Sequence, residues 1–374
     1  MRRQIDSITG VRAISAMIIA YVTHYMILIG APFKGWAGWL FFQVSCVYTT
    51  APDLFFVLSG FLICMIYEEK FISRAITFVD FIVPKIIKIY PLMIVMAVVI
   101  YVLENKGLSL FGEYPLYSYK GEERYTMFNL ILNILGLQCG WISETDDRAI
   151  NGPSWFISIL MVCYSLHYLV ANYSKGPTRI PIYVLLVIVG SVIYIHPLNV
   201  PLMYTNNGRG YYGYFIGVLM AEIFERKKID TIYLEKFAIP IGIISTIVWS
   251  LSIYWAWDGP VDVTKWMILV FYPMFTYTII YGRFFKWIWS RKIFVKLGKI
   301  AMEIFLCNVP TLVAIYYIKF YLSIDISLTN VPAWIVVILI SLIVAGICYW
   351  LFEEIVGKYM LRMFKRLRYN DSNK

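Results

Sequence analysis

The sequence predicts an all-α fold, a polytopic transmembrane helical bundle with about ten spans. Two observations lead to this prediction. Hydrophobic residues make up 60% of the 374 residues and charged residues only 15%, which is more hydrocarbon than a soluble globule can cover with polar surface. The hydrophobic residues also gather in long runs separated by polar segments, as in chains that cross a bilayer repeatedly. We therefore expect a multi-pass protein in contact with membrane lipids.

Ten hydrophobic runs qualify as spans, and the charges between them predict an orientation. The runs are residues 8–30, 50–68, 90–104, 154–172, 182–198, 211–225, 238–256, 266–282, 300–320 and 332–355. Lys and Arg collect on the cytoplasmic side of membrane proteins. With the N-terminus inside, most of the 33 Lys and Arg residues fall in inner segments. We therefore expect both termini to be cytoplasmic and the protein to lie in a plasma membrane. The net charge of +10 is then an orientation signal, and no nucleic-acid partner is predicted.

A further apolar segment, Met127 to Leu137, tests this count, because an eleventh crossing would reverse the side of every later loop. We expect it to be a short interfacial or re-entrant helix within a polar outer loop, residues 105–153. The acidic residues of this loop are Glu122, Glu123, Asp146 and Asp147. The whole chain, 1–374, is expected to be one integral membrane domain with a cytoplasmic tail, residues 356–374.

The cysteines give no sign of a metal site. All six are scattered, mostly within apolar runs, without a CxxC pair or the spacing of metal ligands: Cys46, Cys64, Cys139, Cys163, Cys307 and Cys348. We expect them to pack in the interior, and no metal is predicted. His167 and His196 lack a surrounding motif and are expected to be structural.

The first run contains two ionisable residues, Arg12 near its start and His24 near its end. Such groups are costly to place in a bilayer, so they are candidate functional residues. On a helix the twelve-residue spacing separates them by ~18 Å along the axis, one near each membrane face. This arrangement suits chemistry that links the two sides. Imidazole is also well suited to act as a general base near neutral pH.

Several motifs follow one another along the chain. The most specific is Ala51-Pro-Asp-Leu-Phe-Phe-Val-Leu-Ser-Gly-Phe-Leu-Ile63. The others are Gly10-Val-Arg-Ala-Ile14, Lys85-Ile-Ile-Lys-Ile-Tyr-Pro91, Asn151-Gly-Pro-Ser-Trp-Phe-Ile-Ser158, Arg209-Gly-Tyr-Tyr-Gly-Tyr-Phe-Ile-Gly217, Leu297-Gly-Lys-Ile300 and Phe352-Glu353. Together they resemble the bacterial acyltransferase family 3, integral membrane enzymes that O-acylate cell-surface polysaccharides and related acceptors.

The resemblance implies roles for particular residues. His24 and Arg12 would be catalytic, and Arg12, Lys85 and Lys88 would bind the donor. The acceptor site or the residues that support it would include Asp53, Ser59, Trp155, Arg209 and Asn308. Lys85 and Lys88 lie one helical turn apart, so both side chains can face one phosphate group.

Some positions depart from the family pattern. His24 follows Arg12 by one residue more than usual, which on an ideal helix turns the two side chains about 120° apart instead of about 20°. A π-bulge or an unwound turn would restore the alignment. Lysines at 85 and 88 replace arginines and lack their bidentate fork for phosphate. The remaining departures are Thr9 for an aspartate, Leu160 for a glutamate and Asn308 for a histidine.

These observations predict an O-acetyltransferase that takes acetyl-CoA as donor substrate and acylates a hydroxyl of an extracytoplasmic polysaccharide or lipid-linked glycan. Two other functions stay open. One is a polysaccharide exporter or flippase, although no paired Gly/Pro-broken helices mark two halves of the chain. The other is a non-catalytic membrane partner of a polymer synthase. The sequence identifies neither the sugar nor the oligomeric state, a homodimer included.

Overall fold

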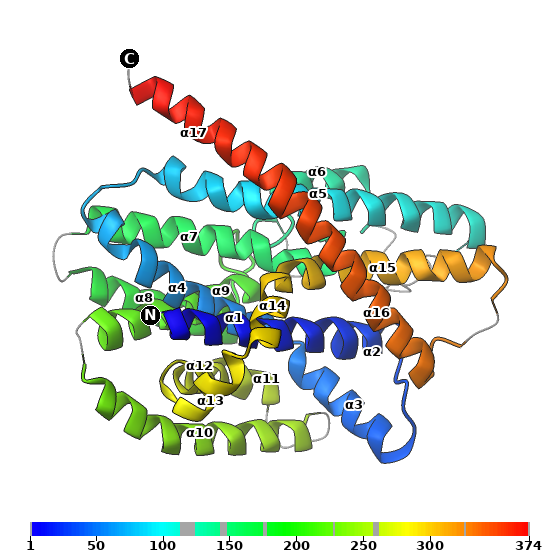
Figure 1. Cartoon of the computed structure of the whole chain (residues 1–374), viewed down its shortest axis with the longest axis horizontal. Coiled ribbons are helices and arrows are strands. Elements are labelled where there is room, and N and C mark those ends of the chain that lie inside the picture. Colours follow the sequence, from blue (N-terminus) through cyan, green and yellow to red (C-terminus); the bar gives the residue numbers. More distant parts are fainter. Residues whose placement is uncertain are drawn as a thin grey trace.

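The fold is a bundle of helices, described for residues 2–112, 124–142, 148–174, 178–226, 229–256, 262–324 and 327–372 of a computed structural model. All regular structure in these ranges is helical. Most of the long helices lie side by side along the long axis of the molecule, and the helix formed by α16 and α17 crosses them obliquely (Figure 1). The predicted all-α fold is confirmed.

The first part of the chain builds the helices that carry most predicted site residues. In order they are α1 (Arg2–Ile18), the π-helix η1 (Ile19–Thr23), α2 (His24–Leu28), α3 (Gly35–Tyr48), α4 (Pro52–Ile72), α5 (Phe78–Phe111), α6 (Met127–Leu135), the 3₁₀-helix η2 (Gly152–Ser154), α7 (Trp155–Tyr173), α8 (Arg179–Ile195), α9 (Thr205–Met220) and the π-helix η4 (Ala221–Arg226).

The second part completes the bundle. Its elements are α10 (Thr231–Tyr254), α11 (Val263–Trp266), the π-helix η5 (Met267–Phe271), α12 (Tyr272–Tyr281), α13 (Arg283–Trp289), α14 (Lys292–Lys299), α15 (Ala301–Tyr321), α16 (Val331–Cys348), the π-helix η6 (Tyr349–Gly357) and α17 (Lys358–Ser372).

All ten predicted spans lie on helices. By length and composition, seven helices among the described residues can cross a membrane, and an eighth span results if α3 and α4, bent by 44° at their junction, count as one. α8 is apolar but shorter, with 17 residues. A helical membrane bundle is therefore confirmed, whereas ten crossings with both termini cytoplasmic remain a prediction.

Three boundaries differ from those expected. α5 continues to Phe111, so the stretch 105–153 begins with two turns of helix rather than with loop. α3 lies between two of the predicted runs, and the tail from 356 onward is helical through most of its length. α6 has nine residues, too few to cross a bilayer, which confirms the expected short helix. The four acidic residues predicted for the outer loop lie outside the described residues.

The first span contains a π-bulge, one of the two devices expected from its sequence spacing. The π-helix η1 lies between Arg12 and His24. Because a π-bulge accommodates one extra residue in a helix, the twelve-residue spacing behaves like eleven, and the angular offset falls from about 120° to about 20°. Arg12 and His24 therefore lie on nearly the same face of the span, at different depths.

Glycines set the contact between α4 and α9. A Cβ atom at Gly60 would lie 1.9 Å from the carbonyl oxygen of Tyr214, and one at Gly217 would lie 2.0 Å from that of Val57. Any side chain at either position would push the two helices apart, as at small-residue contacts between membrane helices. The close approach fixes Asp53 at the start of α4 relative to Arg209 at the start of α9.

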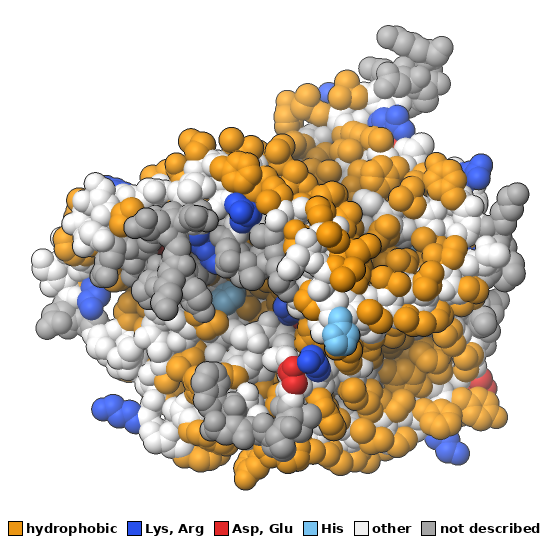
Figure 2. Space-filling view, turned by 180° about the vertical axis from the view of Figure 1, so that it is seen from behind, with side chains coloured by type: hydrophobic (Ala, Val, Ile, Leu, Met, Phe, Trp, Pro, Cys, Tyr) orange, Lys and Arg blue, Asp and Glu red, His pale blue; other side chains and the backbone are white. Residues whose placement is uncertain are grey.

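The outside of the bundle is apolar. Exposed side chains follow one another at four-residue intervals on α10 and on α16: Ile239, Ile243, Ile247, Leu339, Ile343 and Ile347. Figure 2 shows hydrophobic side chains over a broad part of one face. A surface of this kind is stable in contact with lipid rather than with water.

Candidate active site

A cavity of about 510 Å³ opens among the ends of several helices. The end of α4, the start of α5, the start of α15 and parts of α1, α7, α14 and η6 form its walls. It is lined by Thr9, Arg12, Phe55, Ser59, Leu62, Ile63, Ile66, Tyr67, Lys85, Lys88, Ile89, Phe156, Leu160, Tyr164, Gly298, Lys299, Ala301, Met302, Phe305, Tyr349 and Glu353. We call it the donor pocket, and the end of the bundle at which it opens the Lys85 end.

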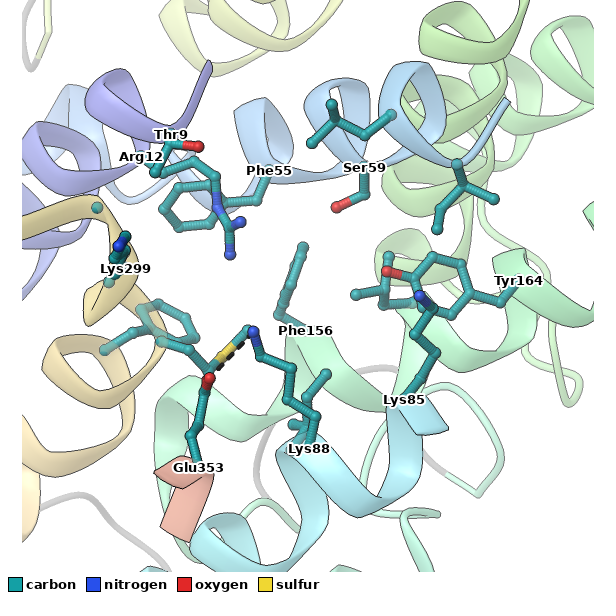
Figure 3. Close-up of a pocket in the computed structure, with 18 of the residues that line it drawn as sticks. Thr9, Arg12, Phe55, Ser59, Lys85, Lys88, Phe156, Tyr164, Lys299 and Glu353 are labelled. Atoms are coloured by element: carbon teal, nitrogen blue, oxygen red, sulfur yellow. Dashed lines mark ion pairs between the residues drawn. The ribbon is translucent and has the colours of Figure 1, made fainter. Parts of the chain in front are cut away.

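The donor pocket is basic. Arg12, Lys85, Lys88 and Lys299 line it together with one carboxylate, Glu353, which leaves a formal excess of three positive charges. Figure 3 shows Arg12 pointing inward from α1, with the two lysines of α5 on the opposite wall. Three residues predicted to bind the donor thus share one cavity.

The basic residues of the pocket differ in how far they are neutralised. Nζ of Lys88 lies 3.2 Å from a carboxylate oxygen of Glu353. Nζ of Lys85 instead donates to the hydroxyl of Tyr67 at 3.3 Å and lies 4.6 Å from the centre of its ring. Among the described residues no carboxylate forms an ion pair with Arg12, Lys85 or Lys299. Lys85 and Lys88 therefore differ in their surroundings, because only Lys88 pairs with a carboxylate among the described residues.

Lys299 is a pocket residue that the sequence analysis did not single out. Its signal was the Leu297-Gly-Lys-Ile300 motif. A Cβ atom at Gly298 would lie 1.9 Å from the carbonyl oxygen of Thr9, so only glycine allows α14 to pack this closely against α1. That contact brings Lys299 to the same cavity as Arg12.

The far end of the donor pocket is aromatic. Phe55 of α4, Phe156 of α7 and Phe305 of α15 contact one another, with ring centres 6.0 to 6.3 Å apart and interplanar angles of 70° to 86°. All three side chains are buried. We call them the phenylalanine triad. Ser59, predicted to support the acceptor site, lines the donor pocket below the triad.

His24 contacts one ring of the phenylalanine triad. The centre of its ring is 6.5 Å from that of Phe305, and His24 is not among the residues that line the pocket. Nδ2 of Asn308 lies 2.8 Å from Nδ1 of His24, so two predicted site residues are in contact. In this orientation the amide donates to Nδ1, and the neutral imidazole carries its hydrogen on Nε2. Asn308 is buried, and its Oδ1 atom has no hydrogen-bond partner among the described residues.

A proline explains the position of Asn151 next to this site. Pro310 lies inside α15 and lacks the backbone N–H that would bond to the Leu306 carbonyl four residues earlier. Nδ2 of Asn151 donates to that carbonyl at 2.8 Å. The Asn151-Gly-Pro-Ser-Trp-Phe motif is thereby tied to α15 between Phe305 and Asn308.

Three further predicted residues form a second polar group. Nη2 and Nε of Arg209 donate to the carboxylate of Asp53 at 2.5 and 3.1 Å, and Nη1 donates to Asn206 at 3.1 Å. The guanidinium carbon lies 4.7 Å from the centre of the Trp155 ring. Arg209 lies within α9 rather than in a loop before it, and Asp53 fully engages one edge of its guanidinium. Arg209 therefore has an internal counter-ion.

A separate network of charges lies on the other side of α4. Glu68 and His167, both fully buried, pair at 2.7 Å, and the other ring nitrogen of His167 lies 2.9 Å from the Tyr214 hydroxyl. Arg179 links Glu68 and Glu222, at 3.3 and 3.4 Å. We call this set, together with Arg226, the buried network.

The buried network has the composition of a metal site but not its free ligand atoms. Cys64, Glu68 and His167 offer ligand atoms within 4.8 Å of one another. Both ring nitrogens of His167 are already bonded, and Tyr183 and Arg179 occupy the second oxygen of Glu68. An arginine beside a cation site is also unfavourable. The arrangement is that of an internally neutralised structural cluster.

The predicted site residues thus fall into three groups along the bundle: the donor pocket, the His24–Asn308 pair and the Asp53–Arg209–Trp155 group. The phenylalanine triad joins them, because Phe305 contacts His24 and Phe156 contacts Trp155. Arg12 lines the pocket together with the triad, and His24 contacts the triad through Phe305. A basic cavity, three aromatic rings and an imidazole beside one of them are the arrangement expected of a membrane transferase.

The comparison with protein families identifies this class. The model described as an acyltransferase domain, that of acyltransferase family 3, matches residues 5–350, nearly the whole chain. The chain belongs to this acyltransferase family, as its motifs predicted. Comparisons with curated proteins and with solved structures give no match.

Proposed function

We propose that this membrane acyltransferase is an O-acetyltransferase of the bacterial inner membrane. It moves an acetyl group from cytoplasmic acetyl-CoA to a hydroxyl of an extracytoplasmic polysaccharide or lipid-linked glycan. The observation that carries the proposal is the order of groups along the bundle. A basic cavity opens at the Lys85 end, and His24 contacts Phe305 at its aromatic end.

The donor pocket suits coenzyme A. This molecule carries its negative charges at a diphosphate and a 3′-phosphate, and its pantetheine arm is thin and uncharged. Arg12 presents a planar fork that can bind one phosphate through two hydrogen bonds, while Lys85 and Lys299 act as point charges. The apolar side chains of α4 beyond them, from Tyr67 to Phe55, span ~18 Å of helix. We infer that the phosphates bind at the mouth and that the thioester extends toward the triad.

His24 is the proposed general base. It removes the proton from the acceptor hydroxyl as the hydroxyl oxygen attacks the thioester carbonyl carbon. The C–S bond then breaks, and the sulfur takes the proton from the imidazolium, so that coenzyme A leaves as a free thiol. The thioester supplies the driving force, and the products are the acetylated hydroxyl and coenzyme A.

Asn308 determines which nitrogen of His24 can act. Nε2 accepts a proton only when the neutral ring carries its hydrogen on Nδ1, and Nδ1–H requires an acceptor opposite it. Rotation of the Asn308 amide by half a turn exchanges its nitrogen for its oxygen at this position. In its present position Oδ1 of Asn308 accepts no hydrogen bond from a described residue. The rotation would bring this oxygen to Nδ1 of His24, where it could accept one. We therefore assign Asn308 as the positioning residue of the base.

Reconstitution with defined substrates tests the function. Purified protein in liposomes should consume acetyl-CoA only when envelope glycan is supplied, and the glycan should gain O-acetyl signals in NMR spectra. Surface polysaccharide from cells that lack the gene should lose the same signals. Glycan that crosses the membrane without acetyl-CoA consumption would establish an exporter instead. Normal O-acetylation in the absence of the gene would reject the proposal.

A further inference from the structure

The phenylalanine triad separates the place where the donor binds from the place where it reacts. Phe55, Phe156 and Phe305 come from three different helices and close the inner end of the donor pocket through three mutual edge contacts. His24 contacts Phe305, with ring centres 6.5 Å apart, and is not among the residues that line the pocket. The passage between these rings is therefore a direct route from a thioester in the pocket to His24.

The surroundings of the triad indicate which of its rings is held firmly and which can move. Phe156 is held by Phe56, with ring centres 4.4 Å apart, and by Trp155 next to it in sequence. Trp155 in turn lies under the guanidinium of Arg209. Phe305 lies on α15 five residues before Pro310, where the helix has lost one of its own hydrogen bonds. Phe156 is thus a fixed wall, and Phe305 is the ring best placed to move.

Closure of this passage has a chemical consequence. A thioester that reaches a general base also meets any water there, and water attacks the same carbonyl carbon to give acetate and free coenzyme A. The three phenylalanine side chains offer no hydrogen-bonding group to hold water where they contact one another. Excluding water from a reactive intermediate is one of the established tasks of an enclosed active site.

We propose that Phe55, Phe156 and Phe305 are specificity-determining residues that form an aromatic gate between the donor pocket and His24. The gate admits a thin acyl-thioester arm with a small acyl group, and it excludes water and bulky acyl chains. This inference rests on the proposed function for the nature of the donor. The barrier itself rests only on the ring contacts and on the position of His24.

Side-specific labelling tests the barrier without any catalysis. The six native cysteines are replaced, and His24→Cys is combined with the gate intact, with Phe305→Ala, or with Phe55→Ala and Phe305→Ala. An impermeant, water-soluble methanethiosulfonate is added to one side of vesicles at a time. Ser73→Cys, exposed between α4 and α5, marks the Lys85 side, and Asn199→Cys, exposed between α8 and α9, marks the other.

With the gate intact, the cysteine at position 24 should react slowly from the Lys85 side. Each truncated ring removes two ring–ring contacts, so labelling from that side should rise about ten-fold or more. Phe271→Ala is the matched control, since Phe271 is a buried phenylalanine of η5 that contacts Tyr272 and Phe275. It should leave the rate unchanged. Phe305→Leu keeps most of the volume and provides a folded variant with a smaller increase.

Activity gives the second readout in protein that keeps His24. Phe305→Ala should increase acetyl-CoA hydrolysis in the absence of acceptor and raise the rate with butanoyl-CoA relative to acetyl-CoA. Fast labelling from the Lys85 side with all three rings present, or no increase when two are truncated, would overturn the gate. If labelling behaves as expected but glycan is never acetylated, the gate stands and the proposed function fails.

Discussion

The donor pocket and the buried network lie on opposite sides of α4 and treat charge in opposite ways. Tyr67 and Glu68 are consecutive residues, but Tyr67 lines the pocket and Glu68 lies in the network. Within the network each carboxylate has a cationic partner and both nitrogens of His167 are bonded. In the pocket, four basic side chains share one carboxylate. The difference separates charges that hold helices together from charges that await a ligand.

Energetics explains why the two regions cannot exchange roles. A buried charge that loses its partner is strongly destabilising, so the network has to be complete whenever the protein is folded. In the pocket Lys88 and Lys299 are exposed and Lys85 is partly exposed, so water can solvate these charges in the absence of a counter-ion. Perturbing the network should therefore change stability first, whereas perturbing the pocket and His24 should change kinetics first.

The largest expected effect is that of His24→Ala on turnover. Loss of the proposed base should lower kcat by about 10²–10⁴-fold, while the KM for acetyl-CoA stays close to its normal value because the phosphates bind on the far side of the triad. Steady-state kinetics in liposomes provides the measurement.

His196→Ala is the matched control, since this exposed histidine at the end of α8 lacks any site contact, and it should be fully active. A well-folded His24→Ala protein that acetylates glycan at a near-normal rate would rule out His24 as the base.

The second effect is on stability and concerns Glu68→Ala. Removing this carboxylate leaves the fully buried His167 and the side chain of Arg179 without their shared partner. The free energy of unfolding should fall by about 3–5 kcal/mol, and Tm in detergent should fall with it.

The neighbouring residue Glu69 also pairs with Arg226, but its side chain is 77% exposed. Glu69→Ala should therefore lower the free energy of unfolding by less than ~1 kcal/mol. Equal losses for both variants would contradict the distinction between the buried network and the surface. A raised KM for acetyl-CoA in the folded fraction of Glu68→Ala would show that the buried network also affects donor binding, against the separation of network and pocket.

The sequence predicted the helices well because each run of apolar residues is itself the signal for a span. It also predicted which residues gather at the pocket, since Arg12, Lys85 and Lys88 lie in motifs at helix ends. The surplus residue between Arg12 and His24, counted against the family's usual spacing, predicted either a π-bulge or an unwound turn, and the structure has the π-bulge.

Other features depend on contacts that no local pattern contains. Lys299 reaches the pocket only because Gly298 packs against Thr9, about 290 positions earlier. The Lys88–Glu353 pair and the Asp53–Arg209 pair each join distant helices. The phenylalanine triad draws one ring from each of three helices, and each ring alone is indistinguishable from an ordinary core residue. Polarity and spacing along the chain therefore identified the candidate polar residues. Their contact partners on distant helices became visible only in the folded structure.

A smaller effect is expected at Asn308. Two substitutions there distinguish an amide that accepts a hydrogen bond from Nδ1 of His24 from one that donates to it. Asn308→Asp can only accept at Nδ1 of His24, so the ring keeps its hydrogen there and Nε2 remains a base. This variant should keep its rate within about ten-fold, whereas Asn308→Leu, of similar size but unable to bond, should lose about 10–100-fold in kcat.

The measurement is kcat against pH for both variants, with thermal stability as the control for folding. If Asn308→Asp were the less active of the two, the amide would have to donate to His24 during the reaction, and the proposed role of Nε2 would be wrong.

The smallest effect separates the two lysines of α5 and therefore tests the comparison most finely. Lys85→Ala should raise the KM for acetyl-CoA about two- to five-fold, as expected for the loss of one partly exposed charge contact. Lys88→Ala should raise the KM less, because Glu353 already offsets the charge of Lys88.

Glu353→Gln should act in the opposite direction and lower the KM for acetyl-CoA, since it frees Lys88 for the donor and removes a negative charge from the pocket. All three differences should shrink as salt is raised, because screened charges contribute less. The two lysine variants could instead have equal effects, or Glu353→Gln could leave the KM for acetyl-CoA unchanged at low salt. Either result would show that the Lys88–Glu353 pair does not control donor affinity and that a carboxylate at the mouth is compatible with full affinity.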